Sequence, residues 1–98
     1  MRVIWSGPAL KELAGILEYI AKDSPLTAEN FTLSLYNHVS DVLQDFPRYG
    51  RKIPEIDKDS FRELIHQRYR IMYRIANKEL RILAVKNSRQ LFRGKFGS

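Results

Sequence analysis

The chain contains no cysteine, and this absence excludes several kinds of site. With 98 residues and no thiol, it can form neither a disulfide framework nor a zinc–thiolate centre, and a cysteine nucleophile is excluded. No apolar run approaches the roughly 20 residues of a membrane span. The first ten residues also lack the long apolar core of a secretory signal peptide. We therefore expect a cytoplasmic protein with no membrane partner.

Several chemical motifs are also missing. The sequence has no glycine-rich phosphate loop, no carboxylate cluster at metal-ligand spacing and no Ser-His-Asp arrangement. We therefore expect no metal and no cofactor. What the chain does have is 44% hydrophobic residues, including five Phe, five Tyr and one Trp. That is enough for the core of a single domain covering residues 1–98.

Charge is distributed unevenly along the chain. Residues 1–47 carry three cations and six anions, whereas residues 48–98 carry fourteen cations and five anions. The overall charge of +6 therefore arises from the second half. This asymmetry favours an acidic partner, either nucleic acid or an acidic protein, although a merely solvated basic face would give the same count.

The first half predicts one strand and two helices. Residues 2–5 form a short apolar strand, and helices over 8–22 and 25–45 follow, with Ser6 and Ser24 as N-caps. The helical spacing predicts that two apolar stripes face the core. The first stripe is Leu10, Leu13, Ala14, Leu17, Ile20 and Ala21, and the second is Ala28, Phe31, Leu35, Val39, Val42 and Phe46.

The second half predicts strands. A loop over 47–60, rich in Pro, Gly and charge, precedes strands over 61–66, 68–76 and 79–86 and a basic tail over 87–98. In the middle strand Tyr69 and Tyr73 alternate with basic residues, so we expect both tyrosines in the core. The predicted class is α+β: an N-terminal strand and a helical hairpin packed on one face of a four-stranded, mainly antiparallel sheet. The other sheet face is left for solvent or a partner.

Several segments resemble the ParE/RelE family of toxins from type II toxin–antitoxin systems. They are Ala9-Leu10 through Leu13, Glu18-Tyr19-Ile20-Ala21, Phe46-Pro47-Arg48-Tyr49-Gly50-Arg51, Phe61-Arg62-Glu63-Leu64, Arg68-Tyr69-Arg70-Ile71-Met72-Tyr73-Arg74 and Leu80-Arg81-Ile82-Leu83-Ala84-Val85. The resemblance covers about Val3 to Arg89. It implies a toxin involved in plasmid maintenance and growth inhibition, neutralised by a cognate antitoxin and contacting operator DNA only through that antitoxin.

The resemblance implies two alternative activities on the same fold. RelE-like members cleave messenger RNA on the ribosome, and ParE-like members inhibit DNA gyrase. In this chain Arg70 matches a phosphate-stabilising arginine of the RelE-like members, with His66 and Glu63 as the accompanying candidate catalysts. The tail lacks the His or Tyr that RelE-like members place near their C-terminus. We therefore favour inhibition of gyrase by binding, with no catalytic residue.

A binding protein can use its cations as contacts to an acidic surface or to DNA phosphates. We therefore expect the basic residues of neighbouring strands to form the target-binding or nucleic-acid-binding surface. These residues are Arg68, Arg70, Arg74, Arg81, Lys86 and Arg89.

Overall fold

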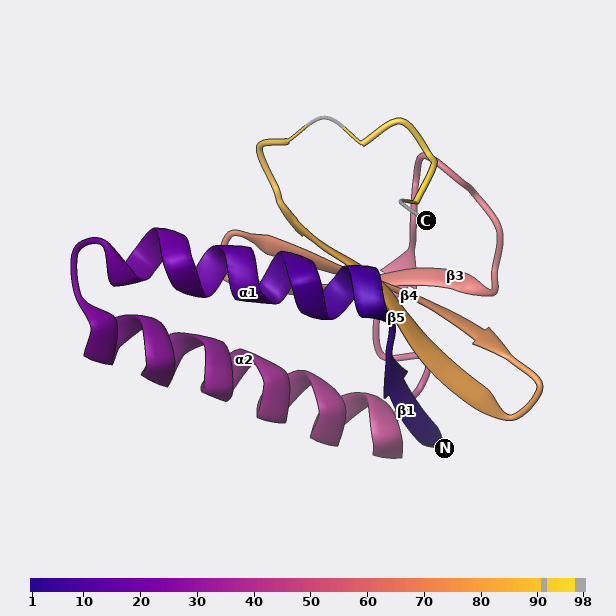
Figure 1. Cartoon of the computed structure of the whole chain (residues 1–98). Helices are drawn as coiled ribbons and strands as arrows, with labels where there is room; N and C mark the ends of the chain where they lie inside the picture. The colour runs from indigo at the N-terminus through magenta and orange to yellow at the C-terminus, as the bar shows by residue number, and fades with distance from the viewer. Residues whose placement is uncertain (91, 97–98) are drawn as a thin grey trace.

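The computed structural model describes residues 1–90 and 92–96 and shows a helical hairpin on one face of a mixed sheet (Figure 1). The elements are β1 (Arg2–Trp5), α1 (Gly7–Ala21), α2 (Pro25–Asp45), β2 (Arg51–Lys52), β3 (Phe61–His66), β4 (Tyr69–Ala76) and β5 (Glu79–Asn87). The strands lie in the order β1-β5-β4-β3-β2. Among the strands of the described residues, β1 and β5 pair in parallel and all other neighbours are antiparallel. The predicted α+β class is confirmed.

Over the described residues the sheet has five strands, so the predicted count of four was wrong. The additional strand is β2, which pairs with β3 through Arg51 and Glu63 inside the segment that we expected to be an uninterrupted loop over 47–60. Gly50 makes this pairing possible, since a Cβ there would lie 2.4 Å from the Glu63 carbonyl oxygen. A two-residue strand has no periodicity for a sequence pattern to reveal.

Local signals set the starts of both helices as predicted. The Ser6 hydroxyl accepts a hydrogen bond from the Ala9 N–H, and the Ser24 hydroxyl accepts one from the Thr27 N–H. Each cap is followed by proline in the first turn, where its missing N–H costs no hydrogen bond. In the described part of the chain, neither helix is long and apolar enough to cross a membrane.

The main core lies between the hairpin and the sheet, and both predicted tyrosines, Tyr69 and Tyr73, are buried in it. The predicted helical stripes were partly wrong, because Leu10 is 46% exposed and Phe46 is 64% exposed. Helix α1 has apolar residues on two sides, and the side facing the sheet carries Ala9 and Leu13. Leu10 lies on the outer face of the hairpin instead.

A second apolar cluster covers part of the opposite sheet face. Met72 of β4 and Ala84 of β5 pack there against Ile53 and Phe92, which come from the β2–β3 connection and the C-terminal tail. We expected this face to be open to solvent or a partner, and over this area that prediction was wrong. Leu91 of the predicted tail lies outside the described residues.

Candidate target-binding site

The six predicted binding cations do not form one surface. Arg81 and Arg74 are exposed near the β4–β5 turn, where Arg81 pairs with Glu79 at 3.1 Å and the Arg74 guanidinium lies 5.2 Å from the ring centre of Phe61. The others separate into a buried arginine, Arg70, and a group along a groove beside α1. That group consists of Arg68 and Arg89, which line the groove, and Lys86, which does not line it but is paired with the groove residue Glu12.

Arg70 lies in an ionic cluster on the sheet face opposite the helices, in which Arg70 and Glu63 are buried, Glu55 is partly exposed and Arg51 is exposed. Its Nε donates to Glu63 at 2.7 Å, and its two terminal nitrogens donate to the two carboxylate oxygens of Glu55 at 2.8 and 2.7 Å. Arg51 of β2 donates to the other oxygen of Glu63 at 2.7 Å. The Arg70 guanidinium lies 5.7 Å from the ring centre of Phe92. Its side chain is only 9% exposed and that of Glu63 is fully buried.

The hydrogen bonds of the cluster stabilise the charged forms of Glu55 and Arg70. The hydrogen bond from Arg70 is the main cause that holds the pKa of Glu55 below its usual value. In return the bonds from Glu55, and secondarily those from Glu63, raise the pKa of Arg70 against the effect of burial. A guanidinium bound by two carboxylates on one side and covered by an aromatic ring on another is not free to bind a phosphate. Arg70 in this structure joins the β2–β3 connection to the sheet.

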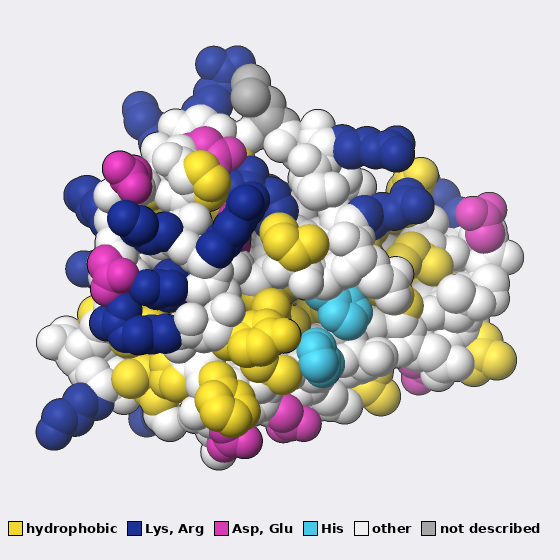
Figure 2. Space-filling view, turned by 180° about the vertical axis from the view of Figure 1, so that it is seen from behind, with side chains coloured by type: hydrophobic (Ala, Val, Ile, Leu, Met, Phe, Trp, Pro, Cys, Tyr) yellow, Lys and Arg dark blue, Asp and Glu magenta, His cyan; other side chains and the backbone are white. Residues whose placement is uncertain are grey.

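The three candidate ribonuclease residues do not converge. Strand register places Glu63 and Arg70 on the outer face of the sheet, whereas His66 is paired with core residue Tyr69 and lies on the helix face. The His66 ring packs 5.6 Å from that of His38, and Figure 2 shows the two histidines side by side at the surface. Partial burial, and then the charge of His38, lower the pKa of His66. His66 is therefore separated from Arg70 by the sheet itself.

Sequence reasoning missed two members of the cluster, Glu55 and Arg51. Both lie in the segment expected to be loop, where no pattern predicts which charged residue turns toward the sheet. The alternation of β3 and β4 did contain part of the signal, since it assigned Glu63 and Arg70 to the same face. Two opposite charges on neighbouring strands and one face predict a cross-strand pair.

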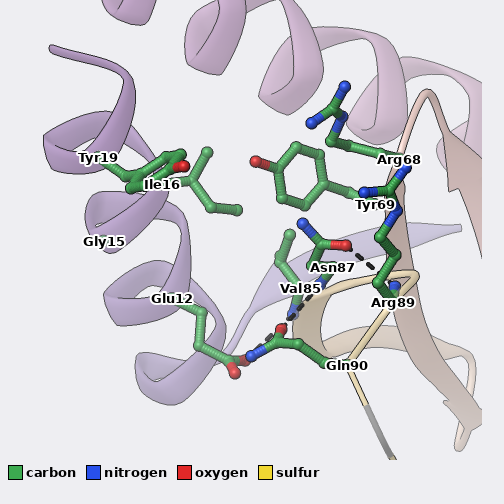
Figure 3. A pocket seen from close by; sticks show the side chains of 10 residues that line it. All are labelled: Glu12, Gly15, Ile16, Tyr19, Arg68, Tyr69, Val85, Asn87, Arg89 and Gln90. Carbon is green, nitrogen blue, oxygen red and sulfur yellow. Dashed lines mark hydrogen bonds between the residues drawn. The ribbon is translucent and has the colours of Figure 1, made fainter. Parts of the chain in front are cut away.

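The groove beside α1 brings together two of the predicted cations, Arg68 and Arg89 (Figure 3). Arg68 lies in the turn between β3 and β4. Gln67, the residue before it, has a left-handed backbone conformation. Arg89 is just beyond β5, where its N–H donates to the Asn87 side chain at 2.9 Å. The groove has a volume of about 510 Å³, within the range of ordinary binding sites.

The groove combines apolar side chains with polar ones and has two arginines at one end. Ile16 and Tyr19 of α1 line one wall, and Tyr69 and Val85 come from the sheet. The full lining is Glu12, Gly15, Ile16, Tyr19, Arg68, Tyr69, Val85, Asn87, Arg89 and Gln90. Arg68 and Arg89 are both exposed and form no ion pair with any carboxylate of residues 1–90 or 92–96. Exposed arginines together with an exposed aromatic ring, here that of Tyr19, are typical of protein-binding surfaces.

Comparison with known proteins identifies the family. The sequence model of the protein family described as "ParE toxin of type II toxin-antitoxin system, parDE" matches residues 3–92 of this chain. The chain belongs to this family. It is also 31% identical over 91 residues to Toxin RelE2 of Caulobacter vibrioides, covering 92% of this chain and 98% of that protein.

A solved structure shows the same fold as this ParE-family chain. A chain from the chromosomal ParDE TA system of P. aeruginosa aligns with a TM-score of 0.74 and 22% identity, over 89% of this chain and 95% of that chain. The protein is a ParE/RelE-type toxin of a type II toxin–antitoxin system, and its family supports a cognate antitoxin as partner. The groove beside α1 and the ionic cluster around Arg70 therefore both belong to a toxin domain of this family.

Proposed function

We propose that this toxin inhibits DNA gyrase by binding it in the cytoplasm, that it catalyses no reaction, and that its antitoxin blocks this binding. The observation that supports the proposal most is the placement of the three candidate catalysts. A metal-free ribonuclease requires a base, an acid and a phosphate-binding cation around one phosphodiester. Here Arg70 and Glu63 are bound to each other and His66 lies across the sheet.

Binding requires only exposed groups of the right charge, and the chain has these at the groove. Arg68 and Arg89 can contact an acidic protein surface or phosphates without breaking an ion pair to a described residue. Tyr19, which is 71% exposed, adds an apolar contact. Arg70 would first have to lose two carboxylate partners.

The alternative function is that of a RelE-like, ribosome-dependent messenger RNA endoribonuclease. It is favoured by the likeness to a relative named Toxin RelE2. For this activity Arg70 would have to leave Glu55 and Glu63, and an acid would have to come from outside the present cluster. That rearrangement would expose Met72 and Phe92, which pack together beside Arg70.

The two functions are separated by assaying purified toxin against both targets. We expect the wild type to block supercoiling by gyrase and to leave messenger RNA intact on programmed ribosomes. The variant Arg68→Ala/Arg89→Ala should lose gyrase inhibition, while Lys58→Ala/Lys78→Ala, which removes two exposed cations elsewhere, should keep it. Cleavage of ribosome-bound messenger by the wild type, with supercoiling unaffected, would contradict the proposal.

A further inference from the structure

Arg74 and Arg81 lie directly opposite each other on the outer face of the sheet. They are register partners in the pairing of β4 with β5, close to the turn that lies farthest from the α1–α2 connection (Figure 1). Both side chains are exposed. Like charges directly opposite one another on one face of an antiparallel pair destabilise that pair. A bound anion would remove this repulsion.

A β-bulge brings the two arginines to the same face. The register of β4 and β5 shifts between Met72 and Tyr73, so that β5 contains one extra residue, Leu83, at this point. Ala84, just after the bulge, packs on the outer face. Side chains alternate between the two faces of a strand, so with unbroken alternation Arg81 would face the helices. Bulges often redirect a side chain in this way beside functional sites.

Other side chains compensate these arginines only in part. Arg81 pairs with Glu79 at 3.1 Å, and both side chains stay partly exposed. Arg74 has the ring of Phe61 beside it and pairs with no carboxylate in the described part of the chain. Strand β1 adds the exposed Arg2, which lies opposite Glu79 in the register. These three arginines and one glutamate leave an excess of positive charge on this part of the face.

A pocket with a volume of about 330 Å³ lies among these side chains, and it is lined by Arg74, Ala76, Asn77, Glu79, Arg81 and Leu83. A guanidinium donates two parallel hydrogen bonds to a carboxylate or a phosphate. The two oxygens of a carboxylate satisfy one guanidinium, whereas the three terminal oxygens of a phosphate monoester can accept hydrogen bonds from two. The charge of such a monoester, about −1.5 to −2 near pH 7, also suits a site with two arginines.

We propose that Arg74 and Arg81 form a binding site for a phosphate group with three terminal oxygens, supplied by inorganic phosphate or by a small phosphate monoester. Both guanidinium groups donate to the terminal oxygens, and the bound anion stabilises the pairing of β4 with β5. The site is distinct from the ionic cluster around Arg70, which lies four residues, or about 13 Å, away along β4. It is also independent of whether gyrase or the ribosome is the target of the toxin.

Titration followed by NMR of the arginine Nε–Hε groups tests the class of ligand. The probes are inorganic phosphate, adenosine monophosphate, dimethyl phosphate and acetate, all at constant ionic strength. We expect the first two to shift the signals of Arg74 and Arg81. Dimethyl phosphate, a monoanion with two terminal oxygens, should bind at least about tenfold more weakly, because it loses charge-assisted hydrogen bonds.

The same titration distinguishes the two sources of the phosphate group. Equal affinities for inorganic phosphate and adenosine monophosphate would assign the site to the phosphate group alone, and tighter binding of adenosine monophosphate would assign it to a nucleotide. An equal response to acetate would overturn the proposal. So would shifts confined to Arg68 and Arg89, because these would place the anion in the groove beside α1.

Substitutions test which residues bind the anion. Arg74→Gln/Arg81→Gln should bind inorganic phosphate at least about tenfold more weakly than wild type. The matched control Lys11→Gln/Lys22→Gln removes the same charge from exposed positions of the helical hairpin and should bind within about twofold. Glu79→Gln removes a negative charge and a competing acceptor of Arg81, so it should bind more tightly. Equal weakening by the two double variants would show a diffuse charge effect and overturn the proposal.

Urea denaturation provides a second readout, for which sodium chloride at the same ionic strength is the control. Added phosphate should raise the midpoint of wild type, because a ligand that binds only the folded state stabilises it, and should not change that of Arg74→Gln/Arg81→Gln. In phosphate-free buffer the single variant Arg81→Gln should equal or exceed wild type, since it removes a contact between like charges. An equal effect of phosphate on wild type and the double variant, or a much lower midpoint of Arg81→Gln, would overturn the proposal.

Discussion

Arg70 and the pair Arg68 and Arg89 have the same side chain, yet they occupy opposite environments. Arg70 is covered by Phe92 and bound by two carboxylates. Arg68 and Arg89 are exposed and pair with no described carboxylate. A guanidinium can be buried at tolerable cost only where acidic partners are supplied. The first region therefore maintains the fold, and the second remains available to partners.

The largest effect should come from removing the centre of the buried cluster. Glu63→Ala leaves Arg70 with a single carboxylate partner, Glu55, in a buried position. We expect a loss of about 4 kcal/mol in the free energy of unfolding, as is usual for removing one partner of a buried pair, because the Arg70 Nε–H then stays buried without its acceptor. Arg51→Ala, whose side chain is 64% exposed, should cost less than about 1 kcal/mol. Urea denaturation followed by circular dichroism measures both, and equal losses would contradict the distinction.

Phe92 should contribute nearly as much to covering Arg70. It is only 6% exposed and packs with Met72 and Ile53 on the outer sheet face. Phe92→Ala should reduce the free energy of unfolding by about 3 kcal/mol, from lost burial and the cavity left behind. Phe96→Ala, a less buried ring of the same tail, is the matched control and should cost less. If neither substitution changes the urea midpoint, the tail does not cover this face in solution.

The exposed arginines should be nearly neutral for stability. We expect Arg68→Ala/Arg89→Ala to change the free energy of unfolding by no more than about 0.5 kcal/mol, as is usual for surface positions. The same variant is expected to lose gyrase inhibition, so it separates function from folding. A loss of several kcal/mol would mean that these side chains support the fold, and the inhibition assay on this variant would then say nothing about binding.

Sequence patterns predicted the elements better than the site, for physical reasons. Alternation in β4 and capping at Ser6 and Ser24 are local signals, and they were sufficient for the α+β class. The partners of Arg70 are not local, since Glu55 is fifteen residues away in an irregular segment. No spacing rule predicts that such a segment folds back over the sheet. For the same reason the sequence predicted a single basic surface from six cations on neighbouring strands: it does not show which of them are paired with carboxylates, as Arg70 and Arg81 are.

The smallest effect should be a pH dependence on the helix face of the sheet. Partial burial of His66, and then the charge of His38, lower the pKa of His66 in the folded protein. The unfolded chain then binds a proton more readily than the folded one, so stability is complete above the unfolded value of about 6.5 and is lost as pH falls through the folded value. The lowered pKa of Glu55 affects stability only at more acidic pH, so it does not obscure this window.

We therefore expect the urea midpoint of the wild type to fall between pH 7.5 and 5.5. His66→Gln cannot be protonated, so its midpoint should change less over the same interval. His38→Gln removes the like charge but leaves His66 partly buried, so its pH dependence should lie between those of the other two proteins. If the urea midpoint changes with pH equally in wild type and His66→Gln, the acid sensitivity comes from other groups. The packing of His66 against His38 would then have no measurable electrostatic effect on stability.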